Sequence, residues 1–378
     1  MRLLICAGGT GGGVYPALAV LEALKGLQVE KSRVSKTAQP VNLETLWVGS
    51  EGGMEADLVK RAGFLYRSIP AAGVHGVDLQ KLPRNLWQLA RGVLASRRIL
   101  RGFCPDVLFF TGGYVAVPMA FAGQRIPTLL YVPDIEPGMA LKAIARFADR
   151  ITVTTPDSQR YFSKSVIVTG YPLRPDLLTW ERKKARVALG LSTRKPTLLI
   201  FGGSKGARSI NKAVLAHLPA LLELAEVVHI SGQLDWDEIE QAEASLNSAQ
   251  KKRYHTFPYL HEMGKALAAA DLVISRSGAS SLGEFPFFEL PAVLIPYPHA
   301  WRYQKVNASY LAWRGAAVII DDSRLQDELL VTIKVLLDNP GKRESMKAAM
   351  RAMSKPNAAR TIASQLMELA TNKDKSHG

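Results

Sequence analysis

The stretch LLICAGGTGGG, residues 3–13, runs a short apolar segment directly into glycines that surround one hydroxyl residue. A second stretch, LLIFGGSKGA, residues 198–207, repeats this arrangement far downstream. A helical pattern follows each stretch, so each predicts a buried strand, a tight turn and a helix N-terminus. Glycine lets the backbone approach a ligand closely, and the free N–H groups of a helix N-terminus attract anions. Together the two stretches predict two similar α/β domains that face a shared, phosphorylated ligand, although either loop alone could be an ordinary strand-to-helix turn.

The length and composition of the chain fit a folded protein of two domains. The chain has 378 residues, of which 47% are hydrophobic, so it can form full cores. Arg2 is followed at once by the first apolar segment, so we expect no signal peptide. Cys6 and Cys104 both lie beside apolar segments and are expected to be core residues, which fits a reducing cytoplasm.

Strand-like and helix-like segments alternate in both halves, which predicts a parallel sheet covered on both faces in each half. The expected strands are residues 3–7, 45–49, 107–110, 127–132, 150–154, 166–168, 198–201, 227–230, 271–275 and 292–296. Residues 16–24, 54–61 and 327–369 are expected to be helical, and residues 26–44 are expected to be a polar loop. Two prolines and a glycine within residues 170–176 mark a junction between domains. The expected parts are therefore 1–170, 171–350, and a C-terminal helix with a frayed tail at 351–378.

The formal net charge of +15 points to an anionic partner. No motif of nucleic-acid-binding proteins is visible, so we expect no nucleic acid partner. The segment from Leu79 to Arg101 contains no Asp or Glu, and its basic residues alternate with Trp and Leu. Such a segment can lie on an anionic membrane surface, but the same pattern suits a surface helix whose apolar stripe faces the protein core.

A third informative segment, SRSGASSLGE at residues 275–284, follows an expected strand. Small hydroxyl residues and a glycine at this place suit a phosphate-binding helix start. Glu284 would lie about a turn and a half further along and could accept two ribose hydroxyl hydrogens. Taken alone, the segment is better explained by a capping Ser followed by a solvated Glu.

Two further motifs are set aside. In the first glycine loop, Val14 takes the place of the third glycine of a dinucleotide fingerprint, and the loop is no Walker A motif, so a nicotinamide enzyme is not expected. Asp235–Trp236–Asp237 matches an Asp-x-Asp metal-binding motif. Its acidic surroundings instead predict a solvated helix N-terminus.

In combination and in order, the motifs resemble those of the MurG family of peptidoglycan glycosyltransferases, from about residue 2 to about residue 321. The motifs are Gly8–Gly12, Met54–Val59, Gly112–Val115, Pro172–Arg174, Gly202–Arg208, Arg276–Ala279 and Glu284. The resemblance implies α/β GT-B architecture: two Rossmann-like parallel-sheet domains with the active site in the cleft between them. It implies inverting transfer of N-acetylglucosamine from UDP-N-acetylglucosamine to lipid I, undecaprenyl-diphospho-N-acetylmuramoyl-pentapeptide, which forms lipid II. It further implies no metal or cofactor, and a peripheral place on the cytoplasmic face of the cell membrane.

By the same resemblance, the C-terminal domain would bind the donor and the N-terminal domain the lipid-linked acceptor and the membrane. Glu284 would bind the ribose, Ser204 the diphosphate and Gln304 the sugar. Leu260 would lie by the uracil, and Arg174 would add positive charge near the nucleotide. The remaining donor residues would be Arg276, Ala279, Ser280, Ser281, Leu282 and Gly283. The acceptor residues would be Thr10, Gly11, Gly12, Gly112, Gly113 and Tyr114.

The sequence departs from the family pattern where a catalytic base is needed. The family's first loop ordinarily ends in His, and Gly13 stands there. The family's paired glutamines are reduced to Tyr303–Gln304, and Asp134 stands where an Asn is expected. Asp134 is the best candidate for the base, ahead of Glu136 and His75, although a turn residue beside Pro133 is the simpler explanation of Asp134. Two alternatives stay open: a GT-B enzyme with another lipid acceptor, and a UDP-sugar-binding protein without catalytic activity.

Overall fold

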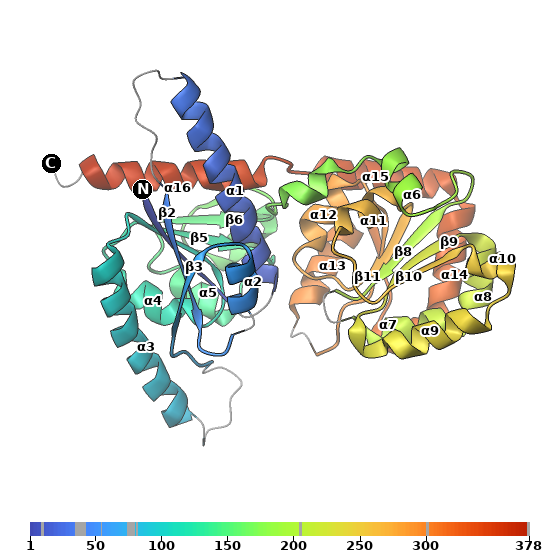
Figure 1. Ribbon diagram of the computed structural model, residues 1–378, viewed down its shortest axis with the longest axis horizontal. Helices are drawn as coiled ribbons and strands as arrows, with labels where there is room; N and C mark the ends of the chain where they lie inside the picture. The colour runs from blue at the N-terminus through green and yellow to red at the C-terminus, as the bar shows by residue number, and fades with distance from the viewer. Residues whose placement is uncertain are drawn as a thin grey trace. The chain divides into compact units, whose positions relative to one another are not determined.

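The chain folds into two compact units in a computed structural model that describes residues 1–8, 11–34, 43–53, 55–73, 80, 82–203, 206–299 and 302–375 (Figure 1). The first unit comprises residues 1–174 together with 356–378, and the second comprises residues 175–355. Each unit is built on one parallel sheet, so the expected pair of α/β domains is confirmed. The chain passes from one unit to the other after Arg174, and the C-terminal helix belongs to the first unit.

The first unit contains a seven-stranded sheet in the order β3-β2-β1-β4-β5-β6-β7, and every pair of neighbours is parallel. Its strands are β1 (Arg2–Ala7), β2 (Glu44–Ser50), β3 (Leu65–Ile69), β4 (Val107–Gly112), β5 (Thr128–Val132), β6 (Arg150–Val153) and β7 (Val166–Val168). Its helices are α1 (Gly11–Val34), α2 (Glu55–Arg61), α3 (Leu82–Phe103), α4 (Ala116–Ala122), α5 (Met139–Ile144) and α16 (Ala358–Lys375).

The second unit contains a six-stranded parallel sheet in the order β10-β9-β8-β11-β12-β13. Its strands are β8 (Thr197–Phe201), β9 (Glu226–Ile230), β10 (Tyr254–Phe257), β11 (Leu272–Ser275), β12 (Ala292–Leu294) and β13 (Ala317–Ile319). Its helices are α6 (Arg182–Ala188), α7 (Arg208–Ala216), α8 (Leu218–Leu224), α9 (Trp236–Ser245), α10 (Ser248–Lys251), α11 (Met263–Ala269), α12 (Ser281–Phe287), α13 (Tyr303–Trp313), α14 (Leu325–Asp338) and α15 (Pro340–Met353).

The central strands are apolar on both sides because helices cover both faces of each sheet. Along β1, Leu4 packs into the core on one face of the first sheet, whereas Leu3 and Ile5 pack into the core on the other. The core that contains Leu3 and Ile5 also contains Ile362 and Leu366 of α16, and α16 lies beside α1 (Figure 1). The C-terminal helix therefore completes the first unit by burying one face of its sheet.

Several local expectations were wrong. Residues 26–34 continue α1, because Leu27 packs into the same core as α16 and extends the buried face of the helix. The strands β3, β10 and β13 were not expected, since they are short edge or near-edge strands with incomplete burial patterns. Cys104 is exposed after the end of α3, whereas Cys6 is buried as expected. None of the helices within the described residues combines the length and apolar character needed to cross a membrane.

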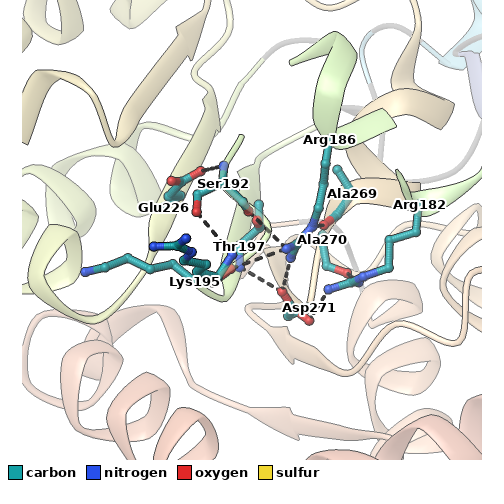
Figure 2. A network of polar contacts seen from close by, with 10 residues as sticks. Arg182, Arg186, Ser192, Lys195, Thr197, Glu226, Ala269, Ala270 and Asp271 are labelled. Carbon is teal, nitrogen blue, oxygen red and sulfur yellow. Dashed lines mark hydrogen bonds and ion pairs between the residues drawn. The ribbon is translucent and has the colours of Figure 1, made fainter. Parts of the chain in front are cut away.

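A cluster of ion pairs closes the amino-terminal edge of the second sheet (Figure 2). The Asp271 carboxylate accepts hydrogen bonds from Arg186 Nη2 at 2.5 Å and from the backbone N–H of Thr197, the first residue of β8, at 2.8 Å. Arg186 is buried and also donates to the Ala269 carbonyl, and Arg182 forms the second ion pair with Asp271. Removing one member of a buried pair typically costs about 3–5 kcal/mol, because the other charge is left buried and unpaired. These residues lie at the end of the second sheet opposite its glycine loop.

Candidate functional site

Both glycine loops lie at the topological switch point of their sheet. β1 lies between β2 and β4, and β8 lies between β9 and β11, so the strand order reverses beside β1 in the first sheet and beside β8 in the second. Ligands of open α/β sheets bind outside the carboxyl ends of the strands at such points. The loops that follow β1 and β8 are therefore the first places where a ligand is expected.

The first glycine loop is anchored at both described ends. A Cβ on Gly113 would lie 2.8 Å from the Gly8 carbonyl oxygen, and the φ of Gly113 is +83°, so only glycine fits there. Trp47 Nε1 donates to the Ala7 carbonyl at 3.0 Å, and Thr111 Oγ1 donates to the Gly13 carbonyl at 2.7 Å. Gly8 and Gly13, on either side of the residues that are not described, are therefore held against the ends of neighbouring strands.

The expected acceptor residues that the structure describes lie together at the carboxyl end of the first sheet. Gly11 and Gly12 open α1, and Gly112 ends β4 with a φ of +146°. Tyr114 follows with 44% of its surface exposed. Thr10 lies outside the described residues, as does His75.

Asp134 lies at the same edge of the first sheet, just after β5. The carbonyl of Pro133 accepts a hydrogen bond from Thr154 Oγ1 at 2.8 Å, which fixes the turn that carries the half-buried Asp134. Glu136 is only 3% exposed and has Lys142 Nζ at 3.9 Å. Because β4 alone separates β5 from β1, Asp134 lies about two strand spacings, roughly 10 Å, from the first glycine loop.

The second glycine loop doubles back tightly on itself. A Cβ on Gly202 would lie 2.3 Å from the backbone nitrogen of Ala207, and a Cβ on Gly206 would overlap the Ser231 carbonyl oxygen. Gly203 has a φ of +97° and faces open space. Ser204 lies outside the described residues, between these two constrained glycines.

A buried polar network supports this loop from behind. Asn211 of α7 donates to the Ser231 carbonyl at 2.9 Å and to Asp235 Oδ2 at 2.7 Å. Its amide oxygen lies 3.0 Å from Nε2 of His229, whose Nδ1 lies 2.8 Å from the Tyr254 hydroxyl. Burial lowers the pKa of His229 to about 3, so the ring is neutral at physiological pH. Asp235 is buried in this network, so the expectation of a solvated Asp235 was wrong, although Asp237 is exposed.

Arg276 follows β11 and joins the carboxyl ends of three strands. Its Nη1 donates to the Ile295 carbonyl at 3.1 Å and to Asp322 Oδ1 at 2.5 Å, and its Nη2 donates to Ser209 Oγ at 2.8 Å. Its guanidinium also stacks over the Tyr297 ring. These contacts favour a structural role for Arg276, which ties together the carboxyl ends of the strands around it.

The other expected donor residues lie around the start of α12. The segment Ala279–Gly283 forms the turn and first residues of this helix, and Ser281 Oγ donates to the Gly278 carbonyl at 2.6 Å. The half-buried Glu284 follows within the first turn. Gln304 accepts a hydrogen bond from Tyr297 N at 2.9 Å, and its carbonyl accepts one from Ser277 Oγ at 2.8 Å.

Two expected donor residues lie on other elements. Leu260 follows β10 in the second unit. Arg174 ends the first unit, and its guanidinium lies over the Tyr15 ring of α1, 4.6 Å from the centroid. Within the described part of the chain, no group of three or more His, Cys, Asp or Glu residues could hold a metal ion.

Comparisons with known proteins agree with this arrangement. The glycosyltransferase family 28 N-terminal domain matches residues 3–153, and the family 28 C-terminal domain matches residues 197–365. A relative from Roseiflexus sp. (strain RS-1) is 41% identical, covering 96% of this chain and 94% of its own, and one from Desulforamulus reducens is 40% identical, covering 96% and 97%. Both are named UDP-N-acetylglucosamine–N-acetylmuramyl-(pentapeptide) pyrophosphoryl-undecaprenol N-acetylglucosamine transferase.

Solved structures support the same assignment. The crystal structure of MurG from Acinetobacter baumannii superposes with a TM-score of 0.74 at 26% identity, covering 97% of this chain and 99% of that one. A UDP-GlcNAc 2-epimerase from Neisseria meningitidis, at 15% identity and a TM-score of 0.63, shares the fold. The chain therefore belongs to glycosyltransferase family 28 and, within it, to the MurG family that its motifs resemble.

Proposed function

We propose that this protein transfers N-acetylglucosamine from UDP-N-acetylglucosamine to lipid I and so forms lipid II. The observation that carries the proposal is the identity of 41% with a relative named for this transfer, over 96% of the chain. The two glycine loops, each at a switch point, supply one anion-binding edge for each diphosphate-containing substrate.

The second unit is assigned the donor. Gly202, Gly203 and Gly206 follow β8, and the half-buried Glu284 lies on the helix that follows β11, so both segments are at the carboxyl end of two neighbouring strands. A carboxylate on the helix after the strand next to a phosphate-binding loop suits the two ribose hydroxyls of a nucleotide. Hydrogen bonds to such a charged group contribute about 1.5–3 kcal/mol. Gln304 and the turn at Ala279–Gly283 complete the donor residues.

The first unit is assigned the acceptor. Gly8, Gly11–Gly13 and Gly112–Tyr114 follow neighbouring strands, so they lie at the carboxyl end of the first sheet and can hold a lipid-linked diphosphate. This assignment leaves the glycosyl-accepting hydroxyl near the turn that carries Asp134.

The direct test is an assay of the purified protein with UDP-N-acetylglucosamine and a short-chain lipid I analogue, with diacylglycerol as the competing acceptor. We expect a disaccharide product from the lipid I analogue alone, in the presence of a metal chelator. Transfer to diacylglycerol would identify a different glycolipid enzyme. Donor binding without any transfer would identify a UDP-sugar-binding protein without catalytic activity.

The proposed general base is Asp134. An inverting transfer needs a group that takes the proton of the acceptor hydroxyl as the new bond forms. Gly13 offers no side chain, whereas Asp134 brings a carboxylate to the carboxyl edge of the first sheet. A Cβ on Gly13 would make only ordinary contacts, the nearest with Thr111 Oγ1 at 3.5 Å, so this place can accept a side chain.

Asp134→Asn is expected to lower turnover by about 10²–10⁴-fold, the usual contribution of a general base, with an unchanged dissociation constant for UDP. The pH–rate profile should also lose its acidic limb. Adding Gly13→His to this variant should recover part of the turnover, because an imidazole would then lie at the same edge. Full turnover in Asp134→Asn, or an equal loss in Glu136→Gln, would move the base to another group.

We propose that α3 docks this peripheral enzyme on the cytoplasmic face of an anionic membrane. Trp87 and Leu94 are 66% and 55% exposed, so this part of the apolar pattern does not face the core. Residues 84, 87, 91, 94 and 98 recur at helical spacing and alternate Arg with apolar side chains along one stripe. The opposite side of α3 packs inward through Ile99 and Leu100. Exposed Trp and Leu beside Arg suit the boundary between headgroups and acyl chains.

Replacing Arg97, Arg98 and Arg101 by Gln should weaken binding to anionic vesicles by about 1 kcal/mol per residue, or roughly 100-fold in total. Salt should weaken the binding of the wild type, and UDP affinity should not change. The matched control replaces three exposed lysines of the second unit, Lys183, Lys251 and Lys252, by Gln. Equal sedimentation with neutral and anionic vesicles, or an equal loss in the control, would show that α3 is ordinary surface.

A further inference from the structure

A buried carboxylate lies directly behind the first glycine loop. Glu55 opens α2 and is only 2% exposed. Its Oε1 accepts two hydrogen bonds of 2.8 Å, one from the backbone N–H of Ser50 and one from the Ser50 hydroxyl. The carboxylate is therefore bound to the carboxyl end of β2, the neighbour of β1.

The niche around this carboxylate is lined by glycines. A Cβ on Gly8, the first residue after β1, would lie 2.9 Å from Glu55 Oε1, and a Cβ on Gly49 would lie 2.8 Å from it. A Cβ on Gly53 would overlap both carboxylate oxygens. Glycine at these positions thus leaves the room that the carboxylate fills between β1, β2 and the start of α2.

The negative charge affects its surroundings. The pKa of the Cys6 thiol, on β1, is raised by burial and then by the nearby Glu55. The pKa of the Tyr66 hydroxyl is raised by the same two causes, and this hydroxyl donates to the Ser50 carbonyl at 3.2 Å. A carboxylate so enclosed cannot reach a substrate, so any effect on catalysis must pass through the loop that it touches.

We infer that Glu55 is a positioning residue that fixes the start of the acceptor-binding loop, by locking Gly8 against the ends of β2 and β4. This inference rests on the proposed function, since it assigns the first loop to the acceptor. Gly8 lies between two constraints: the Glu55 carboxylate on one side and Gly113, whose Cβ position is 2.8 Å from the Gly8 carbonyl, on the other. Loss of the carboxylate removes one of them and lets the loop shift relative to Gly112–Tyr114.

The test compares Glu55→Ala, Glu55→Gln and Ser50→Ala in the full-length protein. A small displacement of a substrate-binding segment can cost up to about 100-fold, so Glu55→Ala should lower kcat/KM for the lipid I analogue by roughly 10–100-fold. Glu55→Gln fills the niche and keeps an oxygen acceptor, so it should recover part of this loss. Ser50→Ala removes one of the two hydrogen bonds and should fall between the wild type and Glu55→Ala.

Two readouts separate positioning from a general loss of stability. Calorimetry should give the wild-type dissociation constant for UDP in all three variants, because the donor loop belongs to the other unit. The acceptor KM or kcat of Glu55→Ala should differ from the wild-type value at a temperature at which circular dichroism shows that the variant is folded. Glu51→Gln, which alters an exposed carboxylate on the same connection, is the matched control and should behave as the wild type.

Three outcomes would overturn the inference. The first is wild-type acceptor kinetics in folded Glu55→Ala. The second is an equal weakening of UDP binding and acceptor use. The third is a loss of activity that follows only the folded fraction. If the wild type itself transfers no sugar to the lipid I analogue, the proposed function fails instead, so the two failures are distinguishable.

Discussion

At the carboxyl ends of the central strands, backbone packs directly against backbone. This close approach determines the geometry of the turns that carry both glycine loops. In the first unit Gly113 packs against the Gly8 carbonyl, and in the second Gly206 packs against the Ser231 carbonyl. Neither position has room for a Cβ, and both have positive φ. The chain therefore turns directly from strand to helix, which leaves N–H groups at the edge of the sheet for an anion.

Buried polar groups hold these turns in place from behind. Asn211 fixes the Ser231 carbonyl in the second unit, and Arg276 joins the ends of three strands beside it. Glu55 has the corresponding place in the first unit. Such groups are costly to bury unless they are hydrogen-bonded. Because these side chains have hydrogen-bond partners, they hold the turns at the carboxyl ends of the strands rigidly. The ion pairs of Asp271 lie at the opposite, amino-terminal end of the second sheet, where the carboxylate also binds the first residue of β8.

The sequence predicted the fold well because its signals are local. An apolar run followed by glycines identifies β1 and β8 with their turns, and the alternation of strands and helices identifies the parallel sheets. Short edge strands such as β3 carry no such signal, because tertiary pairing places them. The return of α16 to the first unit also depends on contacts of Ile362 and Leu366 with residues far away in the sequence.

The supporting residues of the candidate site could not be found from spacing alone. Glu55 belongs to a quoted motif, but its burial depends on three glycines that meet around it: Gly8 after β1, Gly49 within β2 and Gly53 after β2. Asp235 was expected in solvent because its neighbours are acidic, whereas Asn211, on another helix, draws it into the core. The substrate contacts of Glu284, Gln304 and Asp134 stay predictions that rest on their place at the carboxyl edges of the two sheets.

The division of the substrates between the two turns can be measured with one matched pair of variants, Gly113→Ala and Gly206→Ala, each assayed for UDP affinity and for the acceptor KM. Each added methyl group meets a carbonyl oxygen in one turn only. We expect Gly206→Ala to weaken UDP binding with little change in the acceptor KM, and Gly113→Ala to raise the acceptor KM with no change in UDP affinity. If both folded variants change both quantities alike, or neither changes, the two turns do not hold separate substrates.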